Sequence, residues 1–364
     1  MKRVPIHLIT GYLGSGKTTL LNNLLKEDSS HIALIVNDLG SVNIDAKLIN
    51  SSNLKNKDMR MVELSNGCIC CTLQDDFMKE IDELASNPNI DKILVEASGV
   101  SNPANIANGF LMYEEFIKTK CYLSDIVTVV DSNYIYNKYY DDIENYSEDD
   151  EPDIINLIMD QIEFCNTVIM NKCDLLDEEK IKLVYDLIRR LQPEATIIKA
   201  INSNVKSSEL FTKKKLDFDK LMSSSGIAKA LAREEEMDKV NPDFGIKSFV
   251  FEARRPFDRL KLEHYLETEF PTSIIRAKGY IWFKEAPSNV GLVEYAGGEM
   301  TVSKSGQWLA SFTKEEQEEV FKQYPEVLET WDPVYQDRIN QIVFIGKNLE
   351  KDAIIDRLNS CLTE

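Results

Sequence analysis

The sequence predicts an α/β domain, with a mostly parallel β-sheet flanked by helices, followed by a smaller α+β domain. Short apolar segments alternate with amphipathic segments over residues 1–225, which indicates strands and helices in alternation. Several of the short segments are apolar at consecutive positions, as strands buried on both faces are. The pattern changes after the Ser-Ser-Ser-Gly run at 223–226, where we expect the domain boundary.

The elements of the first domain, residues 1–225, follow from these patterns. Strands are expected at 6–10, 32–37, 93–96, 126–131, 168–171 and 196–200, and helices at 17–26, 75–85, 154–163 and 178–191. Residues 226–245 are expected to form a linker. In the second domain, residues 246–364, strands are expected at 246–252, 274–283, 291–295, 299–302 and 341–345, and helices at 258–269 and 351–362.

Charge and hydropathy exclude some kinds of partner. The chain has 61 acidic and 42 basic residues and a net charge of −19, which disfavours binding to nucleic acid. Part of the excess lies in the acidic run 141–153, which we interpret as a solvated loop. No apolar run approaches the 18 or so residues of a membrane span, and the N-terminus does not resemble a secretory signal. We therefore expect a cytoplasmic protein without membrane or nucleic-acid partners.

A phosphate-binding motif follows the first expected strand. Residues 11–18 read Gly-Tyr-Leu-Gly-Ser-Gly-Lys-Thr and satisfy G-x-x-x-x-G-K-[ST]. The glycines allow the backbone N–H groups to surround a phosphate, Lys17 would reach the β- and γ-phosphates, and the Thr18 hydroxyl would bind Mg²⁺. A glycine-rich turn that only caps a helix is the alternative, but the preceding apolar strand favours a P-loop. The nucleotide-binding residues predicted here are Gly11, Gly14, Ser15, Gly16, Lys17, Thr18 and Thr19.

A guanine-binding motif follows the strand at 168–171. Asn171, Lys172 and Asp174 form N-K-x-D, in which the Asp174 carboxylate would accept hydrogen bonds from guanine N1–H and from the exocyclic amine. Asn171 would hold the loop together, and the aliphatic part of Lys172 would cover the base. An ordinary polar turn is the alternative, but its place after a strand in a P-loop protein favours GTP.

Acidic residues after two other strands are candidates for the magnesium corner. Glu96 ends an apolar strand and is followed at Gly99 by a glycine whose N–H could face the γ-phosphate. Asp38 follows the strand at 32–37 and is expected to lie in a first switch segment. We expect Lys17, Thr18, Asp38 and Glu96 to be the catalytic residues, with Thr18 and Glu96 at Mg²⁺. A plain turn remains the alternative for both acidic segments.

Three of the seven cysteines, Cys68, Cys70 and Cys71, lie within four residues. Three thiolates this close can bind one soft cation such as Zn²⁺, with the fourth ligand supplied elsewhere. Buried cysteines without a metal, or a redox pair, are the alternatives, and residue chemistry alone does not choose between them. The odd number of cysteines and the length of the chain disfavour a disulfide framework.

The order P-loop, Cys-x-Cys-Cys, Glu-x-x-Gly and N-K-x-D resembles the CobW-like family of metallochaperone GTPases. Residues 37–45 are similar to the family's N-[ED]-x-G-x-x-x-x-D segment. The R-x-K-G-x-x-W run at 276–282, with Phe257 and Asp258, is similar to its C-terminal domain. Two features depart from the family: the only histidines are His7, His31 and His264, and a client-docking segment is not visible before Lys2.

The resemblance implies slow GTP hydrolysis coupled to binding and release of a transition metal at Cys68, Cys70 and Cys71. Zinc is the expected metal, cobalt the next choice, and a metal-requiring client protein the expected partner. A regulatory GTPase in which a structural metal supports control of a protein partner is the main alternative. A small-molecule kinase is a weaker one, because N-K-x-D is present and no acceptor site is evident.

Overall fold

The computed structural model describes residues 3–37, 60–64, 74–116, 120–139, 152–211, 215–231, 246–296 and 298–363. The chain divides into two compact units, Met1–Gly226 and Ile227–Glu364. Asp38, the three clustered cysteines and nearly all of the acidic run at 141–153 lie outside the described residues. None of the helices within the described ranges is long and apolar enough to cross a membrane.

The first unit contains a parallel sheet in the order β3-β2-β4-β1-β5-β6-β7. Every strand pair in it is parallel. The central strands are buried over most of their length, as their consecutive apolar residues predict. The strands are β1 (Val4–Thr10), β2 (Ile32–Asn37), β3 (Arg60–Leu64), β4 (Lys92–Glu96), β5 (Cys121–Asp131), β6 (Thr167–Asn171) and β7 (Thr196–Lys199).

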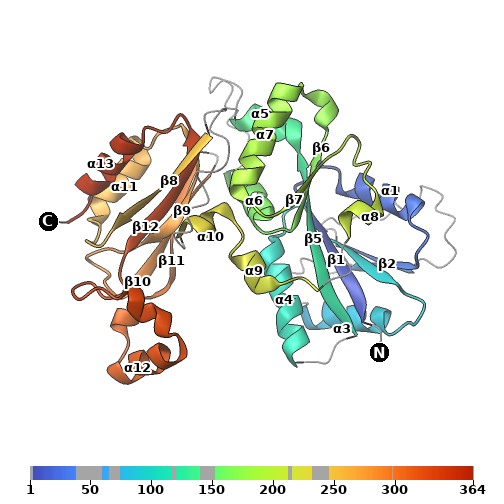
Figure 1. Ribbon diagram of the computed structural model, residues 1–364, viewed down its shortest axis with the longest axis horizontal. Helices are drawn as coiled ribbons and strands as arrows, with labels where there is room; N and C mark the ends of the chain where they lie inside the picture. The colour runs from blue at the N-terminus through green and yellow to red at the C-terminus, as the bar shows by residue number, and fades with distance from the viewer. Residues whose placement is uncertain are drawn as a thin grey trace. The chain divides into compact units, whose positions relative to one another are not determined.

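Helices cover both faces of this sheet. Helix α1 packs Leu20, Leu21 and Leu24 into a core cluster with β1, β2 and β5, and α8 adds Leu210 to the same cluster. Figure 1 shows α4 and α6 on the opposite side of the sheet. The helices are α1 (Lys17–Glu27), α3 (Gln74–Ala85), α4 (Pro103–Phe116), α5 (Ser132–Tyr139), α6 (Pro152–Glu163), η2 (Cys173–Leu175), α7 (Glu178–Leu191), α8 (Ser207–Leu210), α9 (Phe218–Met222) and α10 (Gly226–Leu231).

The second unit contains an antiparallel sheet in the order β11-β10-β9-β12-β8. Its core combines the sheet with α11 and α13, through side chains such as Phe251, Leu262, Phe344 and Leu358. The elements are β8 (Ile246–Ala253), α11 (Arg259–Thr268), β9 (Ile274–Ile281), β10 (Asn289–Ala296), β11 (Glu299–Gln307), η5 (Leu309–Ser311), α12 (Lys314–Gln323), η6 (Pro325–Thr330), β12 (Asn340–Lys347) and α13 (Lys351–Ser360).

The predicted fold class is confirmed, and each strand expected from the sequence is found within a few residues of its predicted limits. Strand β3 and helices α4, α5, α8, α9, α10 and α12 were not predicted, and α10 occupies the first residues of the expected linker. Strand β3 has only five residues, with charged side chains at Arg60 and Glu63, so neither an apolar run nor clear alternation marks it. Helix α4 begins at Pro103 and contains Gly109, which weakens its helical signal.

A buried polar pair joins β1 to β5 away from the strand ends. The Nδ1 atom of His7 lies 2.7 Å from Asp125 Oδ2, and the His7 ring stacks on Phe211 with 4.1 Å between ring centroids. Ser124 and Asn166 also donate hydrogen bonds to the Asp125 carboxylate. Burial lowers the pKa of His7 below its ordinary value of 6.5, although the bond to Asp125 opposes this effect.

We expect His7 to make the first unit less stable as the pH falls below 6.5. The unfolded chain then takes up a proton that the folded state binds less readily, so the free energy of unfolding falls until the lowered folded-state pKa is reached. The slope cannot exceed about 1.4 kcal/mol per pH unit for one proton. Urea titrations between pH 7.5 and 5 should show a shallower dependence for His7→Gln than for the exposed control His264→Gln. Equal slopes would contradict this assignment.

Candidate nucleotide-binding site

The polar residues predicted to form the site meet at the carboxyl edge of the parallel sheet. Strand β1 leads into the phosphate loop, β4 ends at Glu96 and β6 ends at Asn171. Glu96 pairs in register with Ile9 of β1 and Val36 of β2, and Asn171 pairs with Asp131 of β5. In parallel sheets the loops at this edge form the usual ligand site, because all strands point toward it.

The phosphate loop has a backbone that only glycine adopts readily. Gly11, Gly14 and Gly16 have φ angles of 137°, 74° and 112°. A Cβ on Gly11 would lie 2.2 Å from the carbonyl oxygen of Val129, so the loop passes directly against β5. Gly16 precedes α1, whose first N–H groups and dipole favour an anion at this end. Ser15 is buried, and its Oγ has no hydrogen-bond partner among the residues that the structure describes.

Lys17 lies across this loop. Its side chain is largely buried, and Nζ donates to the carbonyl oxygens of Gly11 at 2.8 Å and Tyr12 at 3.3 Å. The ammonium group is thereby held over the hollow of the loop, where a phosphate oxygen could replace a carbonyl as its acceptor. Thr19, predicted beside it, is exposed on the first turn of α1. The loop can therefore hold phosphate groups through backbone N–H groups and one buried ammonium.

Thr18 and Glu96 meet although 78 residues separate them in the chain. The Thr18 hydroxyl donates to Glu96 Oε1 at 3.3 Å, and Glu96 is 1% exposed. A hydroxyl beside a buried carboxylate is the hard oxygen set that Mg²⁺ prefers, and Mg²⁺ typically completes its shell with water and substrate phosphate. The residues present thus fit Mg²⁺. Gly99, three residues later, is buried next to the phosphate loop.

The N-K-x-D segment is fixed to the phosphate loop by Asn171. Its Nδ2 donates to Ser15 O at 2.8 Å, while its Oδ1 accepts from the N–H of Ser203 at 2.7 Å. Lys172 has a left-handed φ of 59°, and its Nζ lies 2.5 Å from Asp131 Oδ2. Asp174 begins the next turn and is exposed, so its carboxylate is accessible to a ligand. This arrangement can hold a base at a fixed distance from the phosphate loop.

The sequence interpretation missed the segment after β7. Ser203 is fully buried, its Oγ donates to Gly16 O at 3.0 Å, and both Asn202 and Ser203 have left-handed φ angles of 50°. Asn23 of α1 donates to the carbonyl oxygens of both residues. The run Asn-Ser-Asn at 202–204, which begins three residues after the end of β7, was an available signal, because polar residues beyond the carboxyl end of a parallel strand face the ligand edge.

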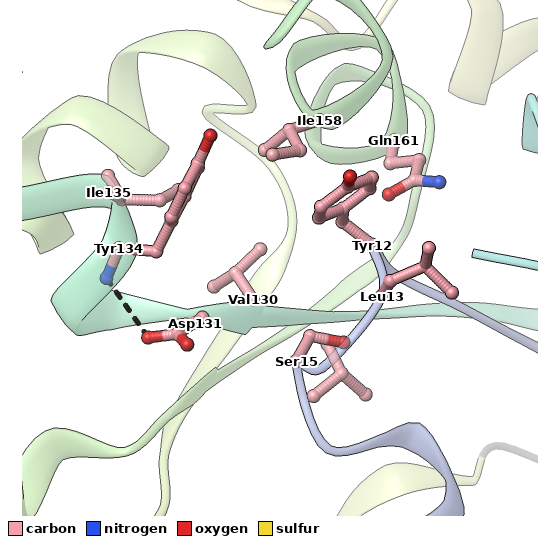
Figure 2. Close-up of a pocket in the computed structure, with 10 residues that line it drawn as sticks. Tyr12, Leu13, Ser15, Val130, Asp131, Tyr134, Ile135, Ile158 and Gln161 are labelled. Atoms are coloured by element: carbon pink, nitrogen blue, oxygen red, sulfur yellow. Dashed lines mark hydrogen bonds between the residues drawn. The ribbon is translucent and has the colours of Figure 1, made fainter. Parts of the chain in front are cut away.

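A small cavity of about 60 Å³ lies between the phosphate loop, the end of β5, and helices α5 and α6 (Figure 2). Tyr12 and Leu13 of the loop face Tyr134 of α5 and Ile158 and Gln161 of α6 across it. Its lining is mostly apolar. Leu13 is 61% exposed, which leaves an apolar side chain beside the expected phosphate position.

Two predicted site segments, Asp38 and the cysteines Cys68, Cys70 and Cys71, lie outside the described residues. The strands that precede them do lie side by side, since Asn37 of β2 pairs with Leu64 of β3 in a parallel register. Cys68 follows Leu64 by four residues in the sequence. Within the described part of the chain, no group of three or more His, Cys, Asp and Glu side chains could hold a metal.

Two family models match this chain. The model of the CobW/HypB/UreG nucleotide-binding domain matches residues 5–199, and the model of the cobalamin synthesis protein cobW C-terminal domain matches residues 246–362. The chain belongs to the CobW/HypB/UreG family. The resemblance inferred from its motifs is confirmed. The prediction of a GTPase is confirmed with it, because the family's nucleotide-binding domain here carries both a P-loop and N-K-x-D.

Relatives of this CobW-type chain include a zinc-regulated GTPase metalloprotein activator 1 of Dictyostelium discoideum. The two are 35% identical over 385 residues, covering 99% of this chain and 80% of the relative. A zinc chaperone CobW of a Sinorhizobium species is 33% identical over 221 residues, covering 57% of this chain and 62% of the relative. A crystal structure of Zn(II)-bound YjiA GTPase from E. coli aligns with a TM-score of 0.41 at 18% identity over the whole of both chains.

Proposed function

We propose that this CobW-type GTPase is a metallochaperone, which binds Zn²⁺ through Cys68, Cys70 and Cys71 and delivers it to a client protein according to its nucleotide state. The observation that carries the proposal is the pairing of β2 with β3. It makes the cysteine segment and the Asp38 segment leave neighbouring strands, at the edge of the sheet where the phosphate loop and Glu96 lie.

In the proposed site, the phosphate loop and Lys17 hold the β- and γ-phosphates of GTP. Thr18 and Glu96 would hold Mg²⁺, which would supply positive charge to neutralise the phosphates. Gly99 meets the γ-phosphate through its backbone, and Asp174 accepts hydrogen bonds from guanine. Asn171 keeps the base-binding and phosphate-binding loops at a fixed separation through its two hydrogen bonds.

The other cysteines support assigning the metal to the triplet. Cys121, Cys165, Cys173 and Cys361 are all buried. Zinc binds thiolates rather than thiols, and burial raises the pKa of the Cys165 thiol to about 12 and also raises the pKa of Cys361. The names of the relatives, a zinc chaperone and a zinc-regulated activator, favour zinc over cobalt. A relative named as a metalloprotein activator favours a protein client.

Loss of the γ-phosphate would change the contacts of the Gly99 segment. Strands β2 and β3, which precede Asp38 and the cysteines in the sequence, end side by side in the same sheet. Metal affinity would then depend on the bound nucleotide. By linkage, zinc must change nucleotide affinity by the same factor.

We expect Zn²⁺ affinity to differ about tenfold between protein loaded with a non-hydrolysable GTP analogue and protein loaded with GDP, which is 1.4 kcal/mol of coupling. A competition titration against a chromophoric chelator measures both affinities. Replacing Cys68, Cys70 and Cys71 together with serine should abolish the binding, whereas the buried control Cys165→Ala should retain it. Tight binding that is identical in both nucleotide states would instead indicate structural zinc in a regulatory GTPase.

A further inference from the structure

A buried glutamine of α6 holds the loop that follows β4. Gln161 is 1% exposed, and its Nε2 donates to the carbonyl oxygen of Gly99 at 3.2 Å and to that of Ser101 at 3.1 Å. The carbonyl oxygen of Gln161 itself accepts from the Thr128 hydroxyl at 2.7 Å, which ties this turn of α6 to β5. One amide group therefore fixes two backbone carbonyls of a loop that lies 60 and 62 residues away in the sequence.

The opposite side of the same loop contacts the phosphate loop. A Cβ on Gly99 would lie 2.8 Å from Leu13 Cδ2 and 2.9 Å from Leu13 N, so the two backbones touch where Gly99 lacks a side chain. The loop start is fixed by the bond from Ala97 N to Ile9 O at 2.9 Å. Gly99 is thus held between α6 on one side and the P-loop on the other.

The environment of Gln161 makes these two bonds hard to replace. The side chain is shielded from water, and the cavity that it shares with Tyr12 and Leu13 is mostly apolar (Figure 2). While the amide is present, both carbonyls have a hydrogen-bond donor, and moving the loop would break these two bonds. If the amide is removed, the two carbonyls stay shielded from water without a donor, which is unfavourable. We expect the loop then to shift until the carbonyls reach water, which moves Gly99 away from the P-loop.

We propose that Gln161 is a positioning residue that keeps Gly99 where the γ-phosphate of GTP meets it, and so sets the preference of the site for GTP over GDP. This rests on the proposed role of Gly99 at the γ-phosphate. GDP carries no group that reaches Gly99, so its binding does not depend on the position of that loop. Replacing Gln161 should therefore change the ratio of GTP affinity to GDP affinity. If Gln161 only supported the fold, its replacement would weaken the binding of both nucleotides by the same factor.

The test compares Gln161→Leu with a matched control, Gln192→Leu. Gln192 is also fully buried, and its Nε2 donates to Glu163 O at 2.6 Å and to Ser224 Oγ at 3.0 Å, away from the nucleotide loops. Dissociation constants for a fluorescent non-hydrolysable GTP analogue and for fluorescent GDP are measured on the full chain with Mg²⁺. We expect Gln161→Leu to weaken binding of the GTP analogue about tenfold and binding of GDP less than twofold. Gln192→Leu should leave the ratio unchanged.

Gln161→Glu provides a second variant, because it keeps the size and polarity of the side chain but offers a carboxylate to two carbonyl oxygens. It should shift the ratio in the same direction. An unchanged ratio of the two affinities in both Gln161 variants, or an equal shift in Gln192→Leu, would overturn the inference. If the wild-type chain fails to bind the analogue at all, the proposed nucleotide site itself is wrong, and the inference falls with it.

Discussion

Replacing Asp174 with asparagine is expected to weaken GTP binding at least about 100-fold and to create binding of xanthosine triphosphate. The exposed carboxylate at the start of η2 can accept from both guanine N1–H and the exocyclic amine. An asparagine amide places its N–H donor against the guanine amine, which is also a donor, so one hydrogen bond is lost and two donors face each other. Xanthine carries a carbonyl at that position, which the amide can instead pair with.

Competition between fluorescent GDP and unlabelled GTP, ATP and xanthosine triphosphate measures this change. The matched control is Glu178→Gln, which removes a neighbouring negative charge from an 89% exposed side chain. It should leave the order of affinities unchanged. If Asp174→Asn retained wild-type GTP affinity, the N-K-x-D segment would not be the base-binding loop, and the choice of guanine would have to lie elsewhere.

Replacing Lys17 with alanine should reduce the rate of GTP hydrolysis by about 10²–10³-fold. The ammonium group is held over the phosphate loop by two backbone carbonyls, and its removal takes away a charge-assisted donor where negative charge increases during phosphoryl transfer. Affinity for the triphosphate should fall more than affinity for the diphosphate, because the γ-phosphate loses its cationic partner.

Single-turnover hydrolysis by protein preloaded with GTP separates this catalytic effect from weak binding. Lys26→Ala, in the last turn of the same helix, removes an exposed lysine and serves as the control. Thermal unfolding of both variants checks that α1 still forms. Hydrolysis within threefold of the wild type in Lys17→Ala would remove the P-loop lysine from the proposed mechanism.

By itself the sequence determined the nucleotide class and the order of most elements. A P-loop and N-K-x-D depend on residues within eight and four positions of one another, so their backbone geometry is encoded locally, by Gly11 and Gly16 in one case and by the strand before Asn171 in the other. The buried strands were visible for a similar reason, because burial on both faces requires an apolar run along a single segment.

Only the tertiary structure decided which distant side chains meet. Thr18 contacts Glu96, Asn171 bridges Ser15 and Ser203, and Gln161 reaches Gly99 because the strand order brings the ends of β1, β4 and β6 to one edge. Strand β3 likewise carries little signal of its own and is recognisable through its pairing with β2. These contacts depend on strand order and loop closure over long sequence separations, which neither local propensity nor periodicity encodes.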